Sequence, residues 1–342
     1  MTVTLVKKAL RGSLAHVRHV TAVRPGAARG AVAAVYAQVE RDFGMLAPPV
    51  ALHSPSPEVL AAAWTVLRET LVAAGAVSRA GKEAVATAVS RANSCPYCVA
   101  VHDATLQVLG AGDEDPMLRW AAEASTEAGA RAYGTPFTAA QVPELVGTAV
   151  AFHYYNRVVH VFLDSSPIPT QVPPSIRARL MRMTSRLTRT RLDVATRPGE
   201  ALDLLPPAPL PADLRWAAAN PTIAEGFARA AAAMDAAGAR AVPPAVHTLV
   251  TSSLATWDGT LRGPSRAWVE EAVAPLPGPE RAAGRLALLT AFAPFQVTPD
   301  VVAACRESGA DDRTLVELVA WSALTTARRV GTWITTPATT SG

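Results

Sequence analysis

The sequence predicts an all-α fold built from two tandem helical units. Apolar residues recur every three or four positions over most of the chain, which is the spacing of one helix face. Sustained alternation of apolar and polar residues, the pattern of a half-buried strand, is scarce. Short segments of the first half also return in the same order in the second half, which indicates a duplication.

Length and composition agree with two globular units. At roughly 150 residues per domain, the 342 residues correspond to about two domains. Half of the residues are hydrophobic and 18% are charged, which suffices for a large core and excludes intrinsic disorder as the main state. The formal net charge of +4 is too small to indicate a nucleic-acid partner.

Start and stop signals delimit the helices in chain order. The apolar series that begins at Val32 ends before Gly44, a residue type that caps helix C-termini. Ser56-Pro57-Glu58 combines an N-cap, a first-turn proline and a first-turn acid, and it predicts a helix whose apolar face ends at Gly75. Two helical runs follow at 82–92 and 99–109. Thr298-Pro299-Asp300 gives a second helix start signal near the other end of the chain.

Three short repeats define the two units. They are Ala73-Ala74-Gly75 with Ala236-Ala237-Gly238, Glu144-Leu145-Val146 with Glu317-Leu318-Val319, and Arg157-Val158 with Arg329-Val330. The stretch between the copies is rich in proline at both edges, which is typical of a linker. We therefore expect a first unit over 1–165, a Pro/Arg-rich linker over 166–211 and a second unit over 212–342.

Part of this linker is compatible with a helix and carries six arginines: Arg177, Arg179, Arg182, Arg186, Arg189 and Arg191. The favoured interpretation is a solvated basic face over a short apolar stripe. Docking of an acidic partner or an anionic surface stays open. No aromatic side chain interleaves the arginines, as stacking on nucleic-acid bases would need.

The number of cysteines and the lack of an evident targeting signal bear on the cellular compartment, which we expect to be the cytoplasm. Three cysteines are too few, and odd in number, for a disulfide-stapled secreted scaffold. The basic N-terminus is not followed by an uninterrupted apolar segment, so no signal peptide is evident. Residues 241–257 lack charged side chains, but their prolines, histidine and serines argue against a membrane span. We expect a soluble, cytoplasmic protein without a membrane or nucleic-acid partner.

Ser94-Cys95-Pro96-Tyr97-Cys98 is the segment that carries chemistry. It lies between two predicted helices, and its proline is tolerated in a first helical turn. Two cysteines three residues apart at a helix start face the same side, close enough to form a disulfide. The helix N-terminus stabilises a thiolate, which is the reactive form of a thiol.

His102 and Glu83 complete the candidate site. His102 lies one turn after Cys98 on the same helix face, and Glu83 lies on the preceding helix, within reach of the site. The pattern Glu83-x11-Cys95-x2-Cys98-x3-His102 suits a redox thiol site. One thiol attacks, its neighbour closes a disulfide, and an acid–base pair moves the proton.

This pattern resembles the alkyl hydroperoxidase D-like members of the carboxymuconolactone decarboxylase family. Those proteins are all-helical and carry a Cys-x-x-Cys pair at a helix start, a His four residues later and an upstream Glu. The flanks are similar too, namely Lys82-Glu83-Ala84-Val85, Glu144-Leu145-Val146 and Asn156-Arg157-Val158. The resemblance covers roughly the first half of the chain, and the spacing is fairly specific.

The resemblance implies a thiol-dependent peroxidase that reduces alkyl hydroperoxides without a bound cofactor. Cys98 would attack the peroxide, Cys95 would resolve it, and Glu83 and His102 would form the proton relay. A lipoyl-bearing or thioredoxin-like protein would be the reductant, and a homo-oligomer is compatible with the family. Tyr97 stands where some members carry a second His, so a shorter relay is expected. Exposure alone favours Cys95 as the attacking thiol, whereas the neighbouring His102 favours Cys98.

Other interpretations stay open. Cys95, Cys98 and His102 would supply three zinc ligands, but no second Cys-x-x-Cys or His-x3-His pair completes the set. Inert packing of both cysteines is a second alternative. At the level of function, the alternatives are a decarboxylase that acts on a small lactone acid and a non-catalytic redox sensor or adaptor.

The second half lacks the chemistry of the first. At an offset of 164, the positions of Glu83, Cys95, Cys98 and His102 are taken by His247, Gly259, Arg262 and Arg266. We therefore expect the second unit to act as a scaffold. Cys305 lies in a small apolar run and is expected to be a buried hydrophobe, with a long-range pairing to Cys95 or Cys98 as the alternative.

The histidines outside the motif are not assigned to chemistry. His16 and His19, like His153 and His160, have the spacing of one helix face but no accompanying carboxylate or thiol cluster. Phe152-His153-Tyr154-Tyr155 is expected to form core and pocket wall. By the resemblance, its tyrosines would line the route of the peroxide.

Overall fold

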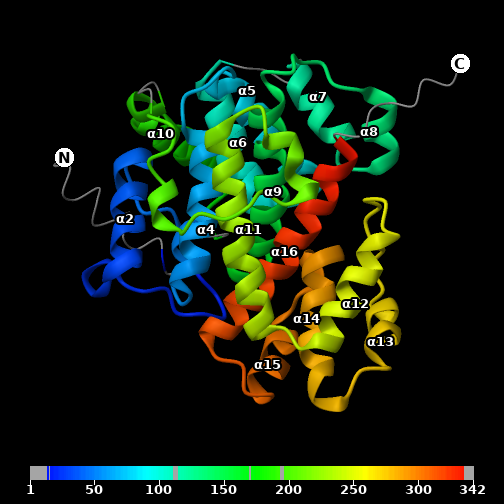
Figure 1. The fold of residues 1–342 in the computed structure, drawn as a ribbon. Helices are drawn as coiled ribbons and strands as arrows, with labels where there is room; N and C mark the ends of the chain where they lie inside the picture. The colour runs from blue at the N-terminus through cyan, green and yellow to red at the C-terminus, as the bar shows by residue number, and fades with distance from the viewer. Residues whose placement is uncertain (1–13, 15, 111–114, 169–170, 193–195, 335–342) are drawn as a thin grey trace, which may run out of the picture.

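The computed structural model describes residues 14, 16–110, 115–168, 171–192 and 196–334, and their side chains apart from those of 184–192. Over these residues the chain is helical and contains no strand. Two isolated bridges, Val17 with Leu163 and Ala73 with Thr196, are the extended pairings found there. The all-α prediction is confirmed (Figure 1).

The first half of the chain carries most of the helices that surround the candidate site. They are α2 (Gly30–Phe43), α3 (Pro48–Ala51), α4 (Pro57–Leu67) with the π-helical turn η3 (Arg68–Val72), α5 (Arg79–Ala92), α6 (Pro96–Val108), α7 (Pro116–Glu123), α8 (Glu127–Tyr133) and α9 (Val142–Phe162). The helix start and stop signals that the sequence predicts lie at the observed helix ends. Gly44 ends α2 in the left-handed conformation with φ 78°, and Ser56 precedes the first-turn proline of α4.

The rest of the chain adds a second set of helices: α10 (Pro174–Leu192), α11 (Pro221–Ala241), α12 (Pro244–Ala255), α13 (Ala267–Val273), α14 (Arg281–Phe292), the short 3-10 turn η7 (Pro294–Gln296), α15 (Pro299–Glu307) and α16 (Asp312–Ile334). Prolines stand at the first turn of most of them, where a missing N–H costs no hydrogen bond. Thr298 is the N-cap residue of α15, as its start signal predicts.

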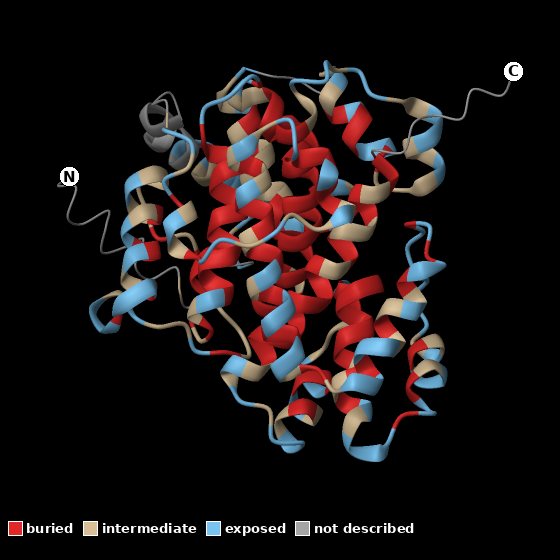
Figure 2. Cartoon of the chain, viewed as in Figure 1, coloured by how far each residue is buried: buried red, intermediate tan, exposed pale blue. Residues whose placement is uncertain are grey.

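Two long helices that are distant in sequence form the centre of the molecule. α9 and α16 pack side by side, and α11 packs against both α4 and α16 (Figure 1). Nearly every residue of α9 is buried, which is typical of a helix enclosed by others. Figure 2 shows buried residues along this centre and exposed residues on the outer faces. The site helices α5 and α6 pack against each other and against α9.

The repeated segments of the sequence lie in this centre. Glu144-Leu145-Val146 stands near the start of α9, and Glu317-Leu318-Val319 near the start of α16. Gly238 lies on α11, where it allows close approach of the Trp321 ring on α16. The division of the chain into two units with a linker between them stays a prediction.

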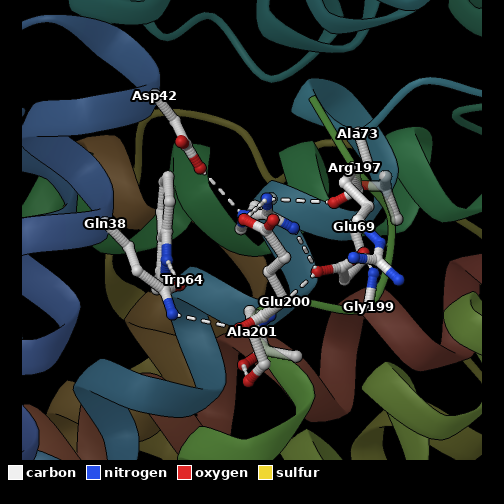
Figure 3. Close-up of polar contacts among 12 residues, drawn as sticks. Gln38, Asp42, Trp64, Glu69, Ala73, Arg197, Gly199, Glu200 and Ala201 are labelled. Atoms are coloured by element: carbon white, nitrogen blue, oxygen red, sulfur yellow. Dashed lines mark hydrogen bonds and ion pairs between the residues drawn. The ribbon is translucent and has the colours of Figure 1, made fainter. Parts of the chain in front are cut away.

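The end of the predicted linker is tied to the first half by ion pairs of the buried Arg68, whose partners Asp42, Glu69 and Glu200 are labelled in Figure 3. The Arg68 guanidinium donates to Asp42 at 2.8 Å, to Glu69 at 2.7 Å and to Glu200 at 2.9 Å. The Glu69 carboxylate in turn accepts the backbone N–H of Gly199 at 2.7 Å. Arg68 is fully buried and satisfied by several partners at once, so the network holds residues 197–201 in one position against α2 and η3.

The arginine-rich part of the predicted linker forms α10, which packs on α6 and touches α2. Arg179 and Arg182 are exposed, as expected for a solvated basic face. The side chains of Arg186, Arg189 and Arg191 lie outside the described part of the chain. The helix therefore lies over the outside of the helix that begins with the cysteine pair.

Candidate active site

The cysteine pair is presented by a tight turn between two helices. α5 ends at Ala92, and Ser94 adopts a left-handed conformation with φ 52°, which is uncommon for a residue with a side chain. This turn places Cys95 at the N-cap of α6 and Pro96 in its first turn. Both cysteines thus lie where the backbone N–H groups of a helix start are unpaired and favour negative charge.

The two thiols are in contact. The Sγ atoms of Cys95 and Cys98 lie 2.9 Å apart, and both cysteines are free. Cys95 is 1% exposed and Cys98 4% exposed. Because the sulfurs already touch, a disulfide between them needs only a small side-chain adjustment.

Cys98 lies in an environment that disfavours its thiolate. Burial raises the pKa of the Cys98 thiol well above its usual value, and the neighbouring Cys95 acts in the same direction. A hydrogen bond from Asn156 and the backbone at the start of α6 partly offset this effect. Ionisation of Cys98 near neutral pH therefore needs a base that takes its proton.

Glu83 and His102 form a hydrogen-bonded pair across α5 and α6. The Nδ1 atom of His102 lies 2.7 Å from Oε2 of Glu83, and the Glu83 carboxylate is buried. The imidazole also packs edge-on against Phe152, with ring centroids 4.5 Å apart. The structure thus pairs Glu83, near the start of α5, with His102, which lies one turn after Cys98 on α6. Cys95 and Cys98 stand together at the start of α6.

Arg79 is a third member of this hydrogen-bonded group that the sequence analysis missed. Its guanidinium lies 2.8 Å from Oε1 of Glu83, one helical turn away on α5. Burial by itself would raise the pKa of Glu83, but the charges and hydrogen bonds of Arg79 and His102 outweigh it and hold that pKa below its usual value. Glu83 is therefore a carboxylate that orients His102. The spacing of four residues between Arg79 and Glu83 is the signal that could have found it.

One face of α9 holds the turn that precedes Cys95. The side chain of Asn93 lies 3.1 Å from Nδ1 of His153, and the amide groups of Asn93 and Asn156 lie 3.0 Å apart. The Nε2 atom of His160 donates to the carbonyl oxygen of Asn93 at 3.2 Å. His153, Asn156 and His160 have the spacing of one helix face, so one face of α9 holds the turn at Asn93 in place. Phe152-His153-Tyr154-Tyr155 is buried, as expected for core.

A cavity of about 720 Å³ opens beside Cys95. Its walls come from the cysteine turn, the end of α9, the N-terminal segment and the η7 region of the second half. The expectation that His16 and His19 share a helix face is wrong. Val17 instead pairs in extended conformation with Leu163. The backbone N–H of Arg18 donates to the carbonyl oxygen of Phe162 at 2.7 Å, and the backbone N–H of Asp164 donates to the carbonyl oxygen of His16 at 3.2 Å.

The positions of the second half that align with the site make packing contacts. The Arg262 guanidinium lies over the Trp268 ring, and Arg266 donates to the backbone carbonyl of Gln296 at 2.6 Å. Cys305 is buried as expected, and its thiol donates to the carbonyl of Ala282 at 3.3 Å. Burial raises the pKa of Cys305 to about 11, which keeps it a thiol.

The described part of the chain offers no metal-ligand cluster and no membrane-spanning helix. No group of three or more His, Cys, Asp or Glu side chains there is arranged to hold a metal ion. None of the described helices combines the length and the apolar character that crossing a bilayer requires.

Comparison with known proteins extends these observations. Residues 58–140 match the model of the carboxymuconolactone decarboxylase family, and this range contains Glu83, Cys95, Cys98 and His102. An alkyl hydroperoxide reductase of Mycobacterium tuberculosis (strain ATCC 25618 / H37Rv) is 41% identical over 336 residues. The alignment covers 93% of this chain and 95% of that protein, so the similarity includes the second half.

Proposed function

The chain belongs to the carboxymuconolactone decarboxylase family, and from this premise we propose that it is a peroxidase that reduces organic hydroperoxides with its Cys95–Cys98 pair. The name of the mycobacterial relative supports a peroxidase-like role at the level of the family. The observation that carries the proposal is the contact of the two sulfurs, 2.9 Å apart at the start of α6, beside the Glu83–His102 pair.

In the first step, Cys98 attacks the peroxide. His102, oriented by Glu83, accepts the thiol proton directly or through a water, because the raised pKa of Cys98 makes spontaneous ionisation unfavourable. The thiolate sulfur then bonds to one peroxide oxygen while the O–O bond breaks. The leaving alkoxide takes a proton from His102 and departs as the alcohol, and Cys98 becomes a sulfenic acid.

In the second step, Cys95 resolves the sulfenic acid. The Cys95 sulfur attacks Sγ of Cys98, hydroxide leaves with the Cys95 proton as water, and a disulfide forms. The contact between the sulfurs favours this step over further oxidation, because the resolving thiol already lies in place. Two thiols and one hydroperoxide thus give one disulfide, one alcohol and one water.

The cycle needs an external reductant and no bound cofactor. Two electrons from a thiol reductant must reopen the disulfide, and by family membership a lipoyl-bearing or thioredoxin-like protein is one source of them. The second half, without cysteines at the aligned positions, would act as a scaffold that covers the first half.

Stopped-flow oxidation of the reduced protein by hydrogen peroxide, tert-butyl hydroperoxide and cumene hydroperoxide tests this proposal. We expect Cys98→Ser to abolish rapid oxidation, and Cys95→Ser to react once and stop as a sulfenic acid that dimedone traps. Cys305→Ser is the matched control and should behave as the wild type.

Two outcomes would contradict the proposal in different ways. Full peroxide consumption by Cys98→Ser would overturn the assignment of the attacking thiol. A disulfide that forms once but never supports turnover with any thiol reductant would instead indicate a redox sensor.

A further inference from the structure

Of the two cysteines, Cys95 lines the cavity beside the cysteine turn and Cys98 does not. Cys95, Pro96 and Tyr97 contribute to its wall, whereas Cys98 is not among the described residues that line it. Its volume of about 720 Å³ lies in the range of small-molecule sites. A molecule in the cavity therefore meets Cys95 first.

The second half of the chain supplies an apolar part of this wall. Phe295 lies on η7 and Val297 directly follows it, about 200 positions along the chain from Cys95. Phe295 is 43% exposed, which is unusual for a phenylalanine in a chain with so large a core. Val159 and Leu163 at the end of α9 extend the apolar surface.

The remaining wall is polar. Asp164 lies between two basic side chains, 3.6 Å from Nε of Arg18 and 3.4 Å from Nδ1 of His16. Arg18 and Asp164 are each about half exposed, so both keep hydrogen-bonding capacity toward a ligand. The cavity wall thus combines apolar and polar residues next to Cys95.

We propose that this cavity binds a small thiol reductant with an apolar body, and that Phe295 and Val297 of the second half determine which thiols reach Cys95. This inference rests on the proposed function, because it assigns the step that reopens the disulfide. The apolar body of the thiol would pack on the Phe295 side, and its polar end would lie near Arg18 and Asp164.

The reopening of the disulfide begins at the cysteine that lines the cavity, Cys95. The reductant thiolate attacks Sγ of Cys95 and forms a mixed disulfide, while the Cys95–Cys98 bond breaks and Cys98 leaves as a thiolate. His102, one helical turn after Cys98 on α6, would return a proton to Cys98. A second thiol then attacks the reductant sulfur of the mixed disulfide, which releases the Cys95 thiolate and leaves the reductant oxidised.

The test uses a variant in which Cys95 is the sole thiol, Cys98→Ser with Cys305→Ser. Its rate of reaction is measured with an aromatic disulfide, 4,4′-dithiodipyridine, and with a small polar one, bis(2-hydroxyethyl) disulfide. In this background, Phe295→Ala should slow the aromatic reagent about fivefold, as expected for one lost aromatic contact, and should change the polar reagent less than about twofold.

Two further variants serve as controls. Phe295→Leu keeps an apolar wall and should restore much of the rate with the aromatic reagent. Leu261→Ala removes an exposed apolar side chain of the second half that does not line the cavity, and it should leave both rates unchanged. Equal effects of Phe295→Ala on both reagents, or no effect on either, would overturn the proposal.

The same comparison of an aromatic with a polar reagent can be made on the protein whose Cys95–Cys98 disulfide is closed. Peroxide-oxidised wild-type protein should be reduced by benzyl mercaptan about fivefold faster than Phe295→Ala, with little difference for 2-mercaptoethanol. If peroxide forms no disulfide, the proposed function fails, while the single-thiol experiment still decides whether the cavity selects apolar thiols.

Discussion

Nδ1 of His102 on α6 lies 2.7 Å from the buried carboxylate of Glu83 on α5, and this contact joins the two helices beside the cysteine pair. The carboxylate fixes which imidazole nitrogen carries the proton toward it and leaves the other nitrogen for proton transfer. Since Arg79 pairs with the second carboxylate oxygen, Glu83 is bound on both sides. A buried charge with two partners orients its neighbours and is itself difficult to protonate.

Glu83→Gln should lower the rate of thiol oxidation by peroxide about 100-fold, because His102 loses the charge that orients it. The variant should also be less stable by about 2 kcal/mol at neutral pH. The pKa of Glu83 is lowered on folding, so this stability difference is fully present above the usual carboxyl value of 4.5 and is lost as the pH falls through the lower folded pKa. Urea unfolding from pH 7 to pH 3 measures it, and a difference that grows on acidification would contradict this assignment.

Arg79→Ala should shift the acid limb of the pH–rate profile toward higher pH. Arg79 helps to hold the pKa of Glu83 down, so its removal lets that pKa rise and Glu83 is protonated sooner as the pH falls. Arg79→Lys keeps the charge and should restore most of the wild-type profile. Stopped-flow oxidation rates between pH 4 and pH 8 give the profiles. An unchanged acid limb in Arg79→Ala would mean that Arg79 has only a structural role.

Cys305 should be unreactive in the folded protein. It is buried, and its pKa of about 11 leaves a negligible thiolate fraction at neutral pH. At pH 7.5, a thiol titration with a disulfide reagent should therefore leave Cys305 unmodified for as long as the fold is intact, and modify all three cysteines in denaturant. Mass spectrometry locates the label. Early labelling of Cys305, or its disulfide with Cys95, would refute the inert assignment.

Gly238→Ala should destabilise the protein by about 2 kcal/mol. A Cβ atom at this position would lie only 2.2 Å from the Trp321 ring, so α11 and α16 would have to move apart. Gly278→Ala is the matched control, because no atom lies within 4 Å of the corresponding Cβ. Thermal unfolding of both variants compares them, and an equal effect would show that the close approach of α11 and α16 is not critical.

Much of the fold could be predicted because its signals are local. The prolines after Ser56 and Thr298 start helices because their fixed φ suits a first helical turn, a property that does not depend on the rest of the chain. Neither side chain caps its own helix, and the Ser56 hydroxyl donates instead to Glu317 of α16 at 2.9 Å. The Cys95–Cys98–His102 spacing likewise acts within one helix. His16 and His19 show the limit of this reasoning, since pairing of Val17 with Leu163 overrides a spacing that is typical of a helix.

Other parts of the site depend on contacts between distant segments. Nothing local to Asn93 indicates that His153 and His160 will hold its turn, because α9 begins about 50 residues later. The same applies to Arg68, whose partners Asp42 and Glu200 come from two other segments. Such partners are chosen by burial, since a charge removed from water must find opposite charges wherever the packing brings them.

The all-α class, the helix starts and the spacing of Cys95, Cys98 and His102 could be predicted before any contact was known, because helix signals and helix-face spacing are properties of neighbouring residues. The packing of distant segments placed His153 and His160 of α9 against the turn at Asn93, and it placed Cys95 and not Cys98 in the cavity wall. It also decided that Phe295, from the half that lacks the Cys-x-x-Cys pair, lines the cavity next to Cys95. The physical reason is that packing of whole helices sets which distant side chains meet, and no local pattern encodes that.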